Sequence, residues 1–146
     1  MSPARGIAAL ACAAVLIVPA GATIAPANAL AAHSVGSPGQ IAWVRRAATN
    51  FVNAELAGNG AGVCGILNAP LRATEHHRTC GQRWDAKLTS MLGQPGARTR
   101  LRSQRRAIGS AAVIVDGNSA SIQLPAPLLN GSNSLLWSEN CWMVAG

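Results

Sequence analysis

The feature that most constrains the fold is a capped amphipathic helix that begins near residue 38. Ser37, Pro38 and Gln40 have the spacing of a capping box with proline in the first turn. Apolar side chains then recur at the i, i+3, i+4, i+7 spacing of one helical face: Ile41, Val44, Ala48, Phe51, Val52 and Leu56. Gly58-Asn59-Gly60 favours the left-handed conformation that ends a helix. We therefore expect a long helix with one buried face.

Two further helices are expected after this one. A short helix is predicted from Ala61 to Asn68, ending before Pro70. Thr79 and Gln82 form a second capping box, which opens a third helix. Its apolar positions are Trp84, Leu88, Met91 and Leu92. Gly93-Gln94-Pro95-Gly96 is expected to end it.

Beyond residue 96 the pattern changes to the alternation that is typical of strands. The predicted strands are residues 98–104, 111–115, 119–124, 134–138 and 141–145. Asp116-Gly117-Asn118 and Glu139-Asn140 are predicted hairpin turns between neighbouring strands. The sequence therefore predicts an α+β fold, with three N-terminal helices packed on an antiparallel sheet of about four to five strands.

The first 29 residues have the order of a secretory signal peptide. Arg5 is followed by an apolar run and by Ala27-Asn28-Ala29, a cleavage site of the A-x-A type. A membrane span is disfavoured because the run is short and is interrupted by Pro19. We expect residues 1–29 to be a signal peptide, residues 30–37 a flexible leader and residues 38–146 one domain. The protein is then extracellular, in the cell-envelope exterior.

Cysteine spacing predicts one disulfide in the mature domain. Cys64, Cys80 and Cys141 remain after processing, and an exported protein is expected to oxidise an available pair. Cys64 and Cys80 lie on the two arms of a helical hairpin, so their pairing is favoured over a pairing of either with Cys141. Cys141 is then interpreted as a small buried side chain rather than a reactive thiol.

The order of these elements resembles a known group of proteins. A long capped helix precedes the cysteine-bearing segment Asn59 to Leu67, and the chain ends in a tight turn before Trp142. This order is similar to exported bacterial members of the nuclear transport factor two-like superfamily. The resemblance implies a cone, in which a curved sheet wraps around the first helix and the mouth is a ligand pocket. Enzymes of this group place Asp or His inside the cone, often with Tyr, and this chain contains no tyrosine.

Few residues suggest catalysis or metal binding. Asp85, with His76 or His77 upstream, could act as an acid–base pair if the three lined one apolar cavity. Asp85 is otherwise a favourable charge near the start of a helix. Glu75, His76 and His77 are adjacent, whereas zinc ligands need spacings that bring them onto one face. We expect no metal and no cofactor, and an enzyme is the less favoured class.

The most distinctive surface feature is a run of arginines: Arg98, Arg100, Arg102, Arg105 and Arg106. The chain has a formal charge of +7. On a strand, alternate arginines share one face and could bind an anionic envelope polymer or lipid head groups, or merely discourage edge pairing. The run has no interleaved aromatic residues, which disfavours specific nucleic-acid recognition. The sequence thus favours a non-catalytic binding module, which could also take a small apolar ligand; a small hydrolase or isomerase and a structural envelope protein are the alternatives.

Overall fold

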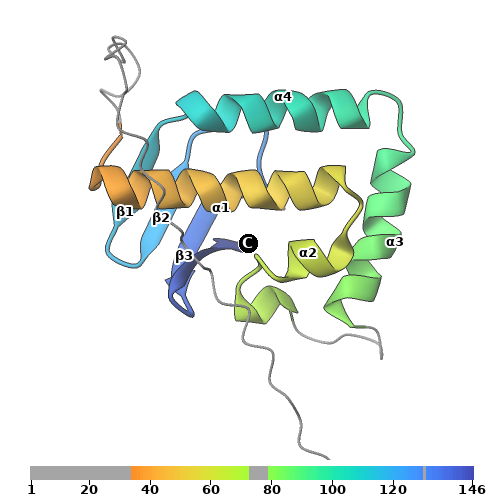
Figure 1. Ribbon diagram of the computed structural model, residues 1–146, viewed down its shortest axis with the longest axis horizontal. Helices are drawn as coiled ribbons and strands as arrows, with labels where there is room; N and C mark the ends of the chain where they lie inside the picture. The colour runs from red at the N-terminus through yellow and green to blue at the C-terminus, as the bar shows by residue number, and fades with distance from the viewer. Residues whose placement is uncertain (1–33, 73–78, 130) are drawn as a thin grey trace, which may run out of the picture.

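The computed structural model describes residues 34–72, 79–129 and 131–146, and within them it has an α+β fold (Figure 1). The helices are α1 (Pro38–Leu56), α2 (Gly60–Cys64), the 3₁₀ helix η2 (Ala69–Arg72), α3 (Cys80–Leu92) and α4 (Ala97–Ser110). The strands are β1 (Val113–Asp116), β2 (Ser119–Ile122), β3 (Ser134–Ser138) and β4 (Cys141–Ala145). The predicted signal peptide and both candidate histidines, His76 and His77, lie outside the described residues. Within those ranges, no helix has the length and apolar character needed to cross a membrane.

The two predicted capping boxes are confirmed. The Ser37 side chain accepts a hydrogen bond from Gln40 N, and the Gln40 side chain accepts one from Ser37 N. Thr79 and Gln82 form the same reciprocal pair at the start of α3. Each box satisfies two backbone donors that a helix N-terminus leaves without an intrahelical partner.

The four strands form one antiparallel sheet in the order β1-β2-β3-β4. Both predicted hairpin turns are present. Gly117 has a φ of 55°, and Glu139 and Asn140 have φ values of 53° and 62°. Two consecutive residues with positive φ match the tight two-residue turn whose twist suits a hairpin. This turn sets the register in which Trp137 pairs with Trp142.

Each outer edge of the sheet is covered by a short segment from the N-terminal half of the chain. Val35 pairs with β1, where Val35 N donates to Val113 O and Val115 N donates to Val35 O, both at 2.8 Å. Val35 belongs to the segment expected as a leader. Leu67 bridges β4 in the same parallel sense, through Asn68 N to Val144 O and Val144 N to Ile66 O. Both edges therefore have part of their backbone hydrogen-bonding groups satisfied within the chain.

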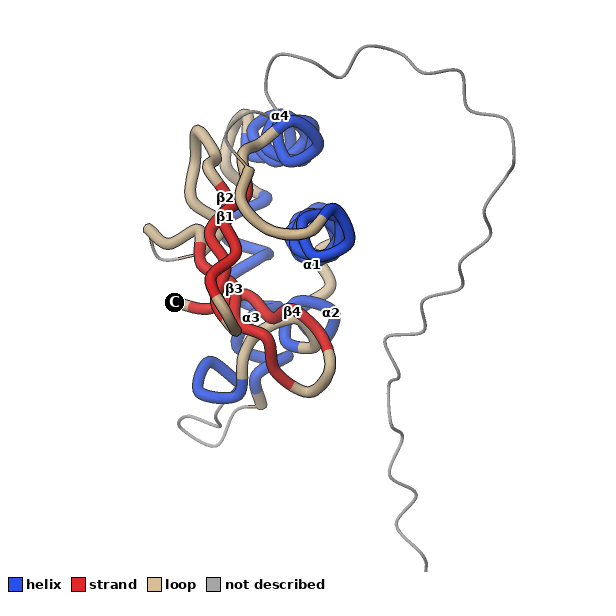
Figure 2. Tube along the Cα trace, turned by 90° about the vertical axis from the view of Figure 1, so that its left-hand side faces the viewer, coloured by secondary structure: helices blue, strands red, loops and turns tan. Residues whose placement is uncertain are grey.

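The core lies between one face of the sheet and two helices. Helices α1 and α4 run side by side in opposite directions over the same face of the sheet (Figures 1 and 2). Val44, Ala48, Phe51 and Val52 of α1 are fully buried. They belong to one core cluster with Val113, Ile122, Leu135 and Val144 from the inner face of the sheet, and with Leu101 and Ile108 of α4.

The predicted strand at residues 98–104 is wrong, because this segment lies within α4. The alternation of arginine with Thr99, Leu101 and Ser103 imitates a strand period, but Ala97, Leu101 and Ile108 are the buried positions and follow a helical one. Gly96, with a φ of 75°, gives the turn that separates α3 from α4. The described residues thus contain four α-helices and four strands, rather than three helices and about five strands.

The predicted disulfide is confirmed between Cys64 and Cys80. Cys64 is the last residue of α2 and Cys80 the first of α3, and their Cα atoms are 6.0 Å apart. The bond therefore joins the second and third helices, as the sequence predicted.

Candidate functional site

Helix α4 presents a row of arginines toward α1 and solvent. Arg98 donates from Nη1 to the carbonyl oxygen of Leu56 at 3.0 Å, and Arg105 donates from Nη1 to Asn53 Oδ1 at 3.3 Å. These two contacts fix the side of α4 that faces α1. Arg102 and Arg106 follow at helical spacings from Arg98 and are exposed. We call Arg98, Arg102, Arg105 and Arg106 the arginine face.

Arg100 does not belong to the arginine face, which corrects the expectation of one alternating ladder. On a helix, residues two apart are about 200° apart around the axis. Arg100 accordingly turns away from α1, and its Nη1 donates back to the Pro95 carbonyl at 3.1 Å. The five arginines therefore divide into a group of four and one on the other side.

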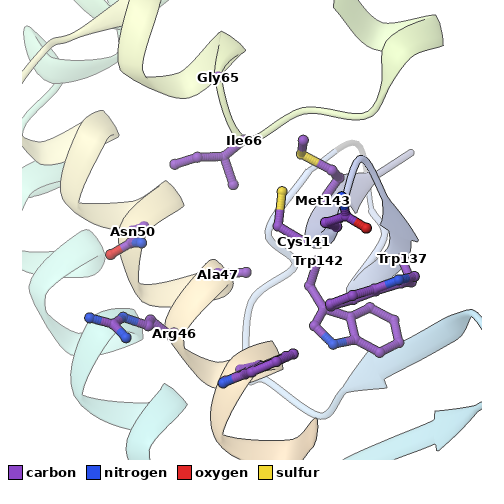
Figure 3. Close-up of a pocket in the computed structure, with 11 residues that line it drawn as sticks. Arg46, Ala47, Asn50, Gly65, Ile66, Trp137, Cys141, Trp142 and Met143 are labelled. Atoms are coloured by element: carbon purple, nitrogen blue, oxygen red, sulfur yellow. The ribbon is translucent and has the colours of Figure 1, made fainter. Parts of the chain in front are cut away.

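A pocket of about 300 Å³ lies beside the N-terminal half of α1 (Figure 3). Four α1 residues at i, i+3, i+4 and i+7 form one wall: Trp43, Arg46, Ala47 and Asn50. The β3–β4 hairpin forms a second wall with Trp137, Trp142 and Met143 and with Asn140 of its turn, and the two walls meet where Trp137 contacts Trp43. Gly65 and Ile66, which follow α2, close one end. We call this site the tryptophan pocket.

Three indole rings in contact form the apolar part of this pocket. Trp43 stacks on Trp137 with a centroid separation of 5.6 Å and an interplanar angle of 7°. Trp137 meets Trp142 edge-on, also at 5.6 Å. Trp43 is 50% exposed, whereas Trp142 is only 5% exposed. One large aromatic ring is thus held in a fixed orientation by its neighbours while half of its surface faces solvent.

The rim of the tryptophan pocket is polar and carries positive charge. Arg46, Asn50 and Asn140 line it and are exposed, and no lining residue is acidic. The two amides can each donate and accept hydrogen bonds, and the guanidinium donates in a fixed planar geometry. The half-buried Cys141 also borders the pocket, and its thiol lies 3.8 Å from the Glu139 carbonyl oxygen. A ligand at this site would therefore meet aromatic faces below and hydrogen-bonding groups at the edge.

The pocket and the arginine face are connected along α1. Arg46 precedes Asn53 by seven residues, so both lie on the same side of α1. Asn53 in turn accepts the hydrogen bond from Arg105. Arg46 therefore lies between the tryptophan pocket and the charged side of α4.

Sequence reasoning missed the tryptophan pocket. Trp43, Ala47 and Asn50 share one stripe of α1, which lies beside the stripe of buried residues. A large aromatic residue at the edge of the buried stripe was a signal for a surface site on this side of the helix. Trp137 and Trp142 flank the predicted two-residue turn, which places them opposite each other in a hairpin. The sequence alone could not show that these two stripes meet.

Asp85, the candidate acid of the sequence analysis, has a structural contact within the described residues. Its Oδ1 accepts a hydrogen bond from Gly60 N at 2.8 Å, which ties α3 to the start of α2. Asp85 is exposed, and it lines neither the tryptophan pocket nor the second cavity described below. Its proposed partners His76 and His77 lie outside the described residues. Among the residues that are described, no three His, Cys, Asp or Glu side chains cluster as metal ligands.

A second, smaller cavity of about 200 Å³ lies near α3 and is lined by Leu67, Trp84, Lys87 and Leu129, among others. The Lys87 ammonium lies 4.2 Å from the centre of the Trp84 ring, within the range of a cation–π interaction. The Trp84 ring also packs against Phe51 of α1. Lys87 and Trp84 are therefore already engaged with each other.

Glu55, on α1, is the one charged residue buried among those described, at 6% exposure. Burial raises the pKa of its carboxyl from 4.5 to about 7, and the ammonium of Lys87 partly opposes this rise. The cause is desolvation, which disfavours the ionised form. Glu55 lines neither cavity, so its titration bears on stability rather than on a ligand.

The chain matches no protein-family model, and no curated protein or solved structure is significantly similar to it. Function is therefore inferred from the arginine face and the tryptophan pocket alone.

Proposed function

We propose that this protein is a non-catalytic binding module that holds an anionic polymer along the arginine face. The observation that carries the proposal is the composition of α4, which has five arginines and no acidic residue in 14 positions. Four of the five lie on one side of the helix. Such a concentration of one charge raises the local concentration of an oppositely charged partner and speeds its association.

Three carboxylates of the described residues are engaged or buried away from the arginine face. Among the described residues, the ion pair joins Arg72 to Glu139 at the hairpin turn. Asp85 is held by Gly60 N, and Glu55 is buried in the core. Arg102 and Arg106 form no ion pair within the described ranges. A partner with regularly spaced acidic groups would neutralise them and release its bound counterions.

The location of the partner follows from the proposed export of the chain. A disulfide persists mainly in oxidising surroundings, such as the exterior of a cell. An anionic polymer of the envelope or of the exterior then meets the protein directly. Membership in the nuclear transport factor two-like superfamily, with its cone-shaped sheet, stays a prediction.

The experiment compares two arginines of one helix on an immobilised polyanion. Arg102→Glu and Arg100→Glu change the net charge equally, but only Arg102 belongs to the arginine face. Retention on a polygalacturonate column is measured over a range of salt concentrations. Arg102→Glu is expected to elute at lower salt and to reduce the slope of log affinity against log salt by about one. Arg100→Glu is expected to retain most of the wild-type slope.

Equal losses in the two variants would show that net charge alone drives retention, and this would contradict an oriented binding surface. Retention of Arg102→Glu at wild-type salt concentrations would remove the function proposed for α4. Circular dichroism of both variants verifies that the helix content is unchanged.

A further inference from the structure

We propose that the tryptophan pocket is a subsite for one sugar ring, so that the anionic partner is an acidic polysaccharide. The negative charge of the partner rests on the proposed function. The sugar ring is inferred separately, from the residues that line the pocket. The arginine face would hold the acid groups of neighbouring units, and the pocket would hold the ring of one unit.

The aromatic part of the pocket suits the apolar face of a pyranose. The C–H bonds on one face of such a ring carry partial positive charge, and the faces of indole rings carry partial negative charge. Trp43 is half exposed and is kept in orientation by stacking on Trp137. A platform that is already ordered binds with a smaller loss of conformational entropy.

The rim suits the hydroxyl edge of the same ring. Each sugar hydroxyl both donates and accepts, as the amides of Asn50 and Asn140 also do. Arg46, beside Asn50 on α1, adds donors for a ring hydroxyl or a carboxylate. Figure 3 shows Arg46 and Asn50 on α1, across from Trp137 and Trp142, with the Arg46 side chain extending away from these two indoles. A ligand that contacts both the indole rings and the amides at the rim has a flat apolar face and a polar periphery.

The size and openness of the tryptophan pocket favour a ligand that is one unit of a longer polymer. A volume of about 300 Å³ is at the lower end of ordinary ligand pockets, so the site holds one ring rather than several. The exposed residues at the rim leave the pocket open to solvent. A polymer can therefore leave the pocket past Arg46 and continue toward Arg105 on α4.

The same geometry disfavours two other polyanions. Single-stranded nucleic acid is bound by aromatic platforms spaced along a basic groove, with one base on each. Here the three indoles contact one another and make a single subsite. A lipid surface is met by side chains that project from the protein, whereas Trp43 lies in a concave pocket against Trp137.

The test measures binding of two sugars by isothermal titration calorimetry, with oligogalacturonide as the acidic probe and maltooligosaccharide of equal length as the neutral one. Trp43→Ala removes the platform. Gly65→Phe places a ring at the end of the pocket that Gly65 lines, because a Cβ there would meet no atom closer than 3.5 Å and the φ of −65° at this position suits any residue. Each variant is expected to weaken binding of the acidic sugar by about tenfold.

Leu136→Ala is the matched control, since Leu136 is also an exposed apolar residue, at 39% exposure, but lies on the outer side of β3. It is expected to bind as the wild type does. Arg102→Glu should weaken the acidic sugar more than the neutral one. Thermal unfolding of all variants verifies that they fold.

The outcomes separate the two proposals. Binding of oligogalacturonide that is unchanged in Trp43→Ala and Gly65→Phe, or absent in the wild type, overturns the sugar subsite. Tighter, Trp43-dependent binding of single-stranded oligodeoxythymidine or of phosphatidylglycerol vesicles overturns it in favour of that partner. If Arg102→Glu binds the acidic sugar normally while Trp43→Ala does not, the function proposed for α4 fails and the subsite stands.

Discussion

In one region of this protein the polar side chains are bonded or buried within the fold, and in another region they are exposed to solvent. At the closed corner, where α2, α3 and the end of α1 meet, a disulfide joins Cys64 to Cys80 and Asp85 accepts from Gly60 N. Glu55 is buried at the end of α1, under the influence of Lys87 of α3. On the open face, formed by the tryptophan pocket and the arginine face, half of Trp43 and the guanidinium groups of Arg102 and Arg106 face solvent.

The difference indicates which residues serve the fold and which remain for a partner. Changes at the closed corner should lower the free energy of unfolding and leave polymer binding intact. Changes on the open face should weaken binding with little effect on stability, because exposed side chains contribute little to folding. Variants of the closed corner therefore test its role in stability, and the binding experiments test the role of the open face.

The largest stability effect is expected from removal of the disulfide. Cys64→Ser with Cys80→Ser should lower the free energy of unfolding by about 3 kcal/mol, because a cross-link over a loop of this size restricts the unfolded chain. Chemical denaturation measures the loss. Cys141→Ser is the control, since it leaves the Cys64–Cys80 bond in place. A double variant as stable as the wild type would contradict the role assigned to the closed corner.

The next effect depends on pH. The pKa of Glu55 is about 7 in the folded protein, against an ordinary value of 4.5, so the folded state binds more protons between these values. The free energy of unfolding should therefore fall as pH rises through this interval, by up to about 3 kcal/mol. Glu55→Gln should remove this fall, as measured by urea denaturation at several pH values.

Lys87→Met sharpens this test. It removes the ammonium that lowers the folded-state pKa of Glu55, so the fall in stability should still begin near pH 4.5 but extend to higher pH. A pH dependence that is the same in Glu55→Gln and in the wild type would show that another group is responsible.

The smallest of the three effects concerns the packing of α2 on α3. A Cβ at Gly60 would lie 2.5 Å from both Asp85 Oδ1 and the Gly81 carbonyl oxygen, so the two helices would have to separate. Gly60→Ala should cost about 1–3 kcal/mol. A Cβ at Gly81 would meet nothing closer than 3.6 Å, so Gly81→Ala should be nearly neutral. Equal thermal midpoints in the two variants would contradict close packing at this corner.

The parts of the fold that could be predicted are those encoded locally. Capping boxes at Ser37 and Thr79 and the turn at Glu139-Asn140 each depend on a few neighbouring residues, and each is present. The segment from Arg98 to Gln104 misled because Leu101 fits a strand and a helix equally, and the burial of Ala97 and Ile108 decides between them. The tryptophan pocket depends on contact between residues nearly one hundred positions apart, which local patterns do not encode.

The most direct test of the account is a map of backbone amide shifts by nuclear magnetic resonance during titration with oligogalacturonide. The largest shifts are expected in three segments of the open face: residues 43–50 of α1, residues 98–106 of α4 and the turn around Asn140. Shifts concentrated instead on α3, or on the exposed outer serines Ser119 and Ser121 of the sheet, would contradict this expectation.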